Sequence, residues 1–126
     1  MARVTVVLDT TAFVDALRKV PAARDLLRGV ESRPVASEVT RVEVIRGLRS
    51  GERAAAEHFF TLIDWHPVDE PIARLAGDFG RTYRRSHDGI GVADLIVAAT
   101  AKHLDAKLIT TNVKHFPMFP KLKPPY

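Results

Sequence analysis

Three carboxylates and one amide are the side chains best suited to chemistry in this chain. Asp9 and Asn112 each follow a short apolar run, Glu43 lies inside a helical pattern, and Asp94 precedes a long apolar stretch. If folding brings them together, they form a set of hard oxygen donors, which Mg²⁺ or Mn²⁺ favours. Such an ion lowers the pKa of bound water and stabilises an in-line displacement at phosphorus.

Each carboxylate also has a possible role that needs no ligand. Asp9 could cap a helix or form a turn, and Asp94 could stabilise a helix dipole by about 0.3–1 kcal/mol. Glu43 shares a helix face with Val39 and could pair with Arg46 or another arginine. These alternatives stay open, because only the fold can unite residues spread over the whole chain.

The elements that must position these residues alternate between strands and helices. Strands alternating with helices imply βαβ crossovers, so we expect an α/β fold whose parallel sheet is covered by helices on both faces. Ligands of such sheets bind beyond the carboxyl ends of the strands, where Asp9 and Asn112 fall. We expect Thr10 or Thr11 to cap the first helix. The pattern predicts strands at 4–8, 34–36, 65–68 and 107–110, and helices at about 10–19, 21–29, 37–49, 52–63, 69–85 and 92–103.

Length and composition fit one globular domain over residues 1–126, with 46% apolar and 27% charged residues. The chain has no cysteine, which excludes disulfides, thiolate nucleophiles and Cys-bound metals. No apolar run approaches the roughly 20 residues that span a bilayer. The segment before residue 9 is too short for a signal peptide, so we expect a cytoplasmic protein without membrane attachment.

Charge is distributed unevenly along the chain, whose net charge is +4. Residues 1–80 carry 11 Lys or Arg and 12 Asp or Glu, whereas residues 81–126 carry 8 and 3. A basic C-terminal third suits a polyanionic partner, because phosphate contacts release condensed counterions.

Four segments resemble the motifs of the PIN-domain nucleases, most closely the VapC-type toxins of bacterial type II toxin–antitoxin pairs. They occur in the family's order and spacing and cover nearly the full chain. The resemblance implies a three-layer α/β/α PIN-like domain with a central parallel sheet flanked by helices. The segments are Val7–Val14, Thr40–Leu48, Gly91–Ala101 and Leu108–Phe116.

Carried over position by position, the resemblance assigns catalytic roles to Asp9, Glu43, Asp94 and Asn112. Asp9 and Asp94 would hold Mg²⁺, or Mn²⁺, directly, and Glu43 would hold it through water or orient the nucleophile. Asn112 stands where many members have a fourth acid, and its amide brings no charge to a second metal site. Thr10 and Thr110 match supporting hydroxyl positions beside the site.

The implied activity is metal-dependent endonucleolytic cleavage of RNA by water. The implied partners are an RNA substrate, a cognate VapB-type antitoxin and a second copy of the chain in a homodimer. Basic residues near the third and fourth motifs could contact RNA phosphates: Arg81, Arg84, Arg85, Lys114 and His115.

Two other functions compete with this one. A non-catalytic nucleic-acid-binding module would keep the fold and the basic face, but the retained carboxylates would repel phosphates. A phosphoacceptor receiver domain needs an acidic pair after its first strand, and this chain offers only Asp9 there.

Overall fold

The computed structural model describes residues 4–87 and 89–126, so the first three residues of the segment considered for a signal peptide lie outside it. None of the helices in these two ranges is both long and apolar enough to cross a membrane. In chain order the elements are β1 (Val6–Leu8), α1 (Thr10–Leu17), α2 (Pro21–Arg28), β2 (Val35–Ser37), α3 (Glu38–Arg46), α4 (Arg53–Phe60), β3 (Asp64–His66), α5 (Glu70–Tyr83), α6 (Val92–His103), β4 (Lys107–Ile109) and the 3₁₀ turn η1 (Val113–His115).

The strands form one parallel sheet in the order β3-β2-β1-β4. Val7 at the centre of β1 is in register with Val35 on one side and Leu108 on the other. The chain leaves β1 towards β2 and reaches β4, on the opposite side of β1, only at its end. The carboxyl ends of β1 and β4 therefore form the switch point at which open α/β sheets bind ligands.

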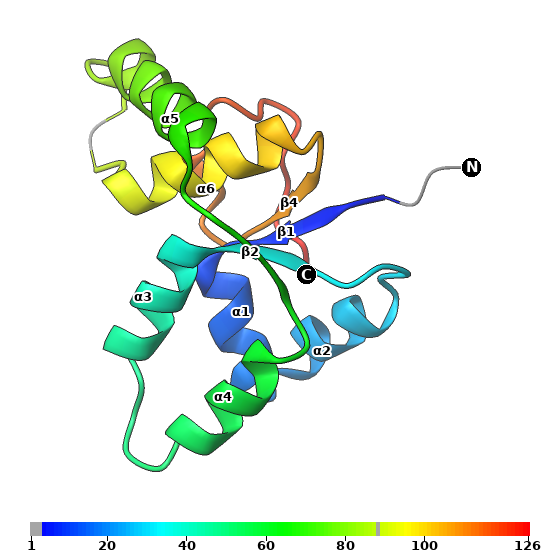
Figure 1. Cartoon of the computed structure of the whole chain (residues 1–126). Helices are drawn as coiled ribbons and strands as arrows, with labels where there is room; N and C mark the ends of the chain where they lie inside the picture. The colour runs from blue at the N-terminus through cyan, green and yellow to red at the C-terminus, as the bar shows by residue number, and fades with distance from the viewer. Residues whose placement is uncertain (1–3, 88) are drawn as a thin grey trace.

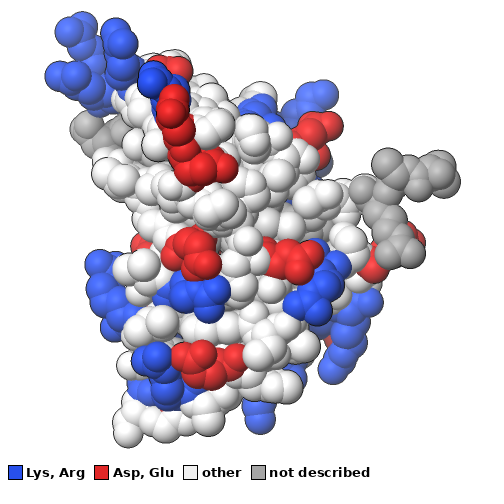
Figure 2. Space-filling model, viewed as in Figure 1, with Lys and Arg blue, Asp and Glu red and all other residues white. Residues whose placement is uncertain are grey.

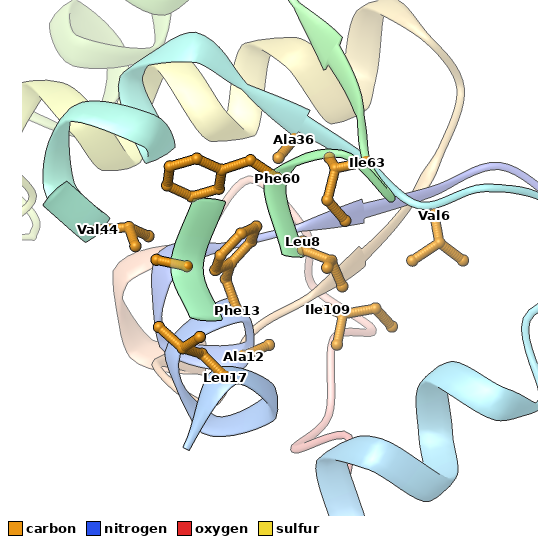
Figure 3. Close-up of a cluster of buried hydrophobic side chains, with 11 residues drawn as sticks. Val6, Leu8, Ala12, Phe13, Leu17, Ala36, Val44, Phe60, Ile63 and Ile109 are labelled. Atoms are coloured by element: carbon orange, nitrogen blue, oxygen red, sulfur yellow. The ribbon is translucent and has the colours of Figure 1, made fainter. Parts of the chain in front are cut away.

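Helices cover both faces of the sheet, as Figure 1 shows with α1, α2 and α4 on one side and α5 and α6 on the other. Because side chains alternate along a strand, Val6 and Leu8 face a cluster that includes Phe13 and Phe60 (Figure 3). Val7 faces the other way, towards α6. The three layers confirm the predicted fold class.

The ends of several helices differ from the predicted ones. Ser37 is the last residue of β2 and also caps α3, because its hydroxyl accepts the Val39 N–H at 3.2 Å. Strand and helix thus join without a loop, and α3 ends before Gly47. The prediction that Thr10 or Thr11 caps α1 was wrong: Asp9 is the N-cap residue, and its side chain makes no capping hydrogen bond.

We expect Ser37→Ala to lower the free energy of unfolding by about 0.5–2 kcal/mol, because the cap of the helix that carries Glu43 is lost. Ser37 is fully buried, so water cannot replace its hydroxyl. Urea denaturation measures the loss, with Ser50→Ala as the control at an exposed turn residue. Equal stabilities of the two variants would show that the cap contributes nothing.

Candidate active site

The first carboxylate of the site, Asp9, lies at the switch point between β1 and β4. Its N–H donates to the Ile109 carbonyl at 2.9 Å, so backbone pairing holds the two strand ends together. Asp9 is buried, with 3% of its surface exposed. The Thr110 hydroxyl donates to Asp9 Oδ2 at 2.7 Å, and the Thr11 hydroxyl donates to the same oxygen at 3.2 Å. In residues 4–87 and 89–126 no Lys or Arg donates to this carboxylate, so its charge is held by neutral donors.

The two hydroxyls that hold Asp9 are themselves held by the backbone after β4. Thr110 Oγ1 accepts the Asn112 N–H at 3.0 Å, and Thr11 Oγ1 accepts the Thr111 N–H at 3.1 Å. The oxygens of Thr11 and Thr110 lie 3.3 Å apart. Thr110 was predicted to support the site, whereas Thr11 was considered only as a helix cap. The second hydroxyl residue directly after the aspartate was the signal that could have identified it.

Glu43 joins the site from α3 through a single hydrogen bond. The Thr10 hydroxyl donates to Glu43 Oε1 at 2.6 Å, which links this carboxylate to the residue next to Asp9. The ion pair with Arg46 that the sequence allowed is absent from the described part of the chain, and Arg46 is exposed. Glu43 therefore belongs with the carboxylates rather than with the surface ion pairs.

Asp94 lies in the first turn of α6 and is bound by groups from two segments. The Gly91 N–H donates to Oδ2 at 3.4 Å, which is the helix-terminal role weighed from the sequence. The same oxygen lies 3.0 Å from His115 Nδ1, and the Asn112 side-chain amide lies 2.7 Å from that nitrogen. Because one ring nitrogen carries either a proton or an in-plane lone pair, Nδ1 cannot donate to Asp94 and accept from the Asn112 Nδ2 amide group at the same time.

Asp94 lies close enough to Asp9 for the charge of Asp9 to affect its ionisation. Burial raises the pKa of Asp94 above its ordinary value of 3.8, and the negative charge of Asp9 raises it further. The Gly91 N–H and His115 act in the opposite direction without cancelling these two effects. Burial and the charge of Asp9 thus disfavour the ionised form of Asp94, a condition that a bound cation would relieve.

The donor set fits a hard divalent cation. Within the two described ranges no three His, Cys, Asp or Glu side chains are close enough together to form a ligand cluster. Mg²⁺, however, usually keeps several waters and takes one or two protein carboxylates. Asp9 and Asp94 offer two that repel each other. That these residues bind a metal stays a prediction.

Most of the predicted RNA-contacting residues lie outside this hydrogen-bond network. Arg81, Arg84 and Arg85 are exposed at the end of α5, where Figure 2 shows a group of basic side chains projecting from the molecule. Lys114 is exposed on η1. Only His115 contacts a site residue, and its bond to Asp94 is a role that the sequence did not indicate. Contact of any of these residues with RNA stays a prediction.

Comparison with known proteins finds one matching family model and similar proteins named as ribonucleases. The PIN domain model matches residues 6–121. The chain is 50% identical over 122 residues to Ribonuclease VapC19 of Mycobacterium tuberculosis, covering 94% of this chain and 98% of that protein. It is 44% identical over 123 residues to Ribonuclease VapC10 of the same organism, covering 96% and 92%.

The fold is also found in solved structures. The chain superposes with a TM-score of 0.81 on a chain of the DNA-bound VapBC crystal structure from Salmonella typhimurium. The superposition covers 95% of this chain and 96% of that one at 21% sequence identity, so it speaks for the fold alone.

Proposed function

Because the chain belongs to the PIN domain family, which confirms the resemblance seen in its four motifs, we propose that it is a metal-dependent endoribonuclease and the toxin of a type II toxin–antitoxin pair. The observation that carries the proposal is the buried Asp9 carboxylate at the switch point of the sheet, held by neutral hydroxyls and close enough to Asp94 to act on its ionisation. A protein gains nothing in stability from such an arrangement unless a cation or a substrate uses it.

The metal in this proposal is Mg²⁺ or Mn²⁺, with Asp9 and Asp94 as the residues that would hold it and Glu43 acting beside them. When bound, such an ion stabilises the charge that develops on a phosphodiester and lowers the pKa of bound water.

The chain's own residues orient these carboxylates. Thr11 and Thr110 both donate to Asp9 Oδ2, which leaves Oδ1 for a ligand. His115 restrains Asp94 from the side of η1. Thr10 occupies Glu43 Oε1, so Oε2 is the oxygen that can accept a hydrogen bond from an attacking water. These hydroxyls and the imidazole are positioning residues, since they act through the carboxylates.

We expect RNA cleavage to require a divalent cation. The purified protein should cut single-stranded RNA with Mg²⁺ or Mn²⁺, lose that activity in excess EDTA, and regain it when the ion is added back. Electron paramagnetic resonance of Mn²⁺ gives a separate readout, because bound ion loses the free-ion signal. Full activity in excess EDTA would refute metal dependence.

Two other outcomes would favour the competing functions. RNA binding that falls with salt, with no cleavage in either ion, would favour the non-catalytic nucleic-acid-binding module. Labelling of an aspartate by a small phosphodonor would favour the receiver domain, which the single carboxylate after β1 argues against.

The partner in this proposal is a VapB-type antitoxin. Structural neighbours of the chain include a toxin–antitoxin complex from Klebsiella pneumoniae and the VapBC complex from Salmonella typhimurium. A toxin that cuts RNA must be restrained in the cell that makes it, so we place both proteins in the cytoplasm. A small open reading frame next to the gene would support this partner. The homodimer stays a prediction.

A further inference from the structure

We propose that a basic cavity beside the edge strand β4 is a second binding site for RNA, one that holds the phosphate backbone away from the cleaved bond. This inference rests on the proposed ribonuclease function. The cavity has a volume of about 680 Å³ and lies between the end of α6, β4 and the C-terminal segment. None of its lining residues is among the predicted RNA contacts.

The charge of the cavity is its most distinctive property. Its lining contains Lys102, Lys107, Lys121 and Lys123 and no Asp or Glu. In the part of the chain that the structure describes, none of these four ammonium groups takes part in an ion pair. One acid, Asp105, lies in the turn that precedes β4. Four cations around one hollow repel one another, and a polyanion is the ligand that turns this repulsion into attraction.

The backbone of β4 adds donors to the same cavity. Lys107 N–H donates to Thr5 and the Ile109 carbonyl accepts from Asp9, so residues 107 and 109 use their backbone groups towards β1. In a parallel ladder the residue between them points its N–H and C=O the other way. Leu108, which lines the cavity, therefore presents its peptide group towards it. A backbone N–H among lysines is a suitable donor for a phosphate oxygen.

The side of the cavity opposite β4 is held in place by contacts with the rest of the fold. Lys102 Nζ lies 4.7 Å from the centre of the Phe119 ring, a cation–π contact that joins α6 to the C-terminal segment. Phe119 and Leu122 pack against the buried cluster on the α6 side of the sheet. The chain end is held as well, because the Tyr126 hydroxyl donates to Asp15 on α1 at 2.6 Å. The lysines of this segment are thus carried on an anchored wall.

The cavity and the candidate active site are joined by consecutive residues at the end of β4. Ile109 lines it, and the next residue, Thr110, holds the Asp9 carboxylate. From Lys107 to Thr110 is three residues, or roughly 10 Å along an extended strand. An RNA strand cut at the carboxylates would therefore pass the lysines within a few nucleotides of the cleaved bond.

RNA fits this cavity better than an acidic protein segment does. Lysines are mobile point charges that suit a backbone of regularly spaced phosphates without reading sequence. The strand that lines the cavity leads to Thr110 and Asp9, and the carboxylates of the candidate active site repel phosphates, a repulsion that must be offset for RNA to bind. The positive charge of the four lysines offsets the repulsion between the carboxylates and the RNA phosphates.

The test compares two variants that lose the same charge. Lys107, Lys121 and Lys123 are changed together to Gln, leaving Lys102 in its contact with Phe119. The matched control changes three exposed arginines to Gln: Arg28 on α2, Arg53 on α4 and Arg74 on α5. Binding of a fluorescein-labelled single-stranded RNA is measured by anisotropy over a range of salt concentrations. EDTA is present, so that binding is recorded without cleavage.

We expect the lysine variant to bind RNA at least about fivefold more weakly. The slope of the logarithm of the binding constant against the logarithm of the salt concentration should become less steep by about 2, because each lost contact with a single strand removes about 0.7. The control should stay within about twofold of the unmodified protein. An unchanged slope in the lysine variant would overturn the inference. Polyglutamate that binds the unmodified protein as tightly as RNA of equal charge would overturn it in favour of an acidic protein partner.

A parallel assay of RNA cleavage in Mn²⁺, on the same proteins, separates this inference from the proposed function. If the unmodified protein cuts no RNA in Mn²⁺ but loses RNA affinity in the lysine variant, the ribonuclease proposal fails and the binding site stands. If the protein cuts RNA and the lysine variant binds RNA as before, the binding site fails alone.

Discussion

Asp9→Asn and Asp94→Asn should each lower the rate of RNA cleavage by at least about 100-fold. Loss of an outer-shell partner of a metal already costs 10–100-fold, and a ligand itself contributes more. Asparagine keeps the size of the side chain and one carbonyl oxygen. At position 9 that oxygen can still accept from Thr11 and Thr110, so the strand ends stay joined. Cleavage of a labelled RNA in Mn²⁺ measures the loss.

Asp94→Asn should be at least as stable as the unmodified protein when no divalent cation is present. The pKa of Asp94 is raised, so this carboxyl binds its proton more readily in the folded than in the unfolded chain. Its ionisation therefore costs folding free energy above the raised pKa, and the asparagine that replaces it cannot ionise. The advantage of Asp94→Asn should shrink as pH falls through the raised pKa and vanish well below 3.8, where the carboxyl is protonated in both states. Thermal melts at several pH values measure it.

A matched control for these substitutions is Asp25→Asn. Asp25 is exposed on α2 and pairs only with Arg28, at 2.9 Å, so cleavage should stay within about twofold. Near-normal cleavage by Asp9→Asn or Asp94→Asn would remove the carboxylate pair from the mechanism. A fall in the stability of Asp94→Asn without added ion would contradict the argument from burial and from the charge of Asp9.

The place of Asp9 could be predicted because it depends on backbone rules. A buried β-branched run followed by a polar residue predicts a parallel strand end, and the switch-point rule then indicates where a ligand binds. Asp9 and Thr110 do meet there. The segment 92–103 was likewise predicted with the bounds that α6 has, because its apolar pattern is long and ends at a turn.

The bonds that orient the other carboxylates could not be predicted from the sequence alone. Glu43 meets Thr10 across 33 residues and Asp94 meets His115 across 21. Such pairs depend on how α3, α6 and η1 pack and on side-chain rotamers. The hydrophobic periodicity of the sequence predicts neither. The sequence therefore left Glu43 between an ion pair and the site. The helix α3 was correctly predicted to begin at its cap residue Ser37, but the strand before it was predicted to end one residue early, at residue 36, because one residue serves as both strand end and helix cap.

Phe13→Ala should lower the free energy of unfolding by about 3–5 kcal/mol, the largest stability loss that we expect from a single substitution. Phe13 is fully buried and stacks on Phe59 with ring centres 4.6 Å apart. Phe60 and Trp65 lie against it at 5.8 and 5.9 Å, and Figure 3 shows the ring surrounded by the cluster between α1 and the sheet. Alanine would leave a cavity that three aromatic neighbours cannot fill by small shifts.

Urea denaturation without divalent cations measures this loss, so metal binding cannot contribute to it. Phe13→Leu keeps most of the apolar volume but not the stacking, and should lose less than Phe13→Ala. Val42→Ala is the surface control, since Val42 is 63% exposed and should change stability by less than about 0.5 kcal/mol. A loss below about 1 kcal/mol in Phe13→Ala would show that the aromatic cluster is not tightly packed.

The Phe13 and Asp9 substitutions should separate stability from activity, although the two residues lie one helical turn apart. The Phe13 N–H donates to the Asp9 carbonyl at 3.0 Å through the backbone, a bond that alanine also makes. Well below its melting temperature, the folded fraction of Phe13→Ala therefore keeps both carboxylates, and its cleavage rate per folded molecule should stay within a few-fold of the unmodified rate. Asp9→Asn should show the reverse: a stable protein without cleavage. Because typical domains are stable by only about 5–15 kcal/mol, the Phe13 substitution uses a large share of that margin.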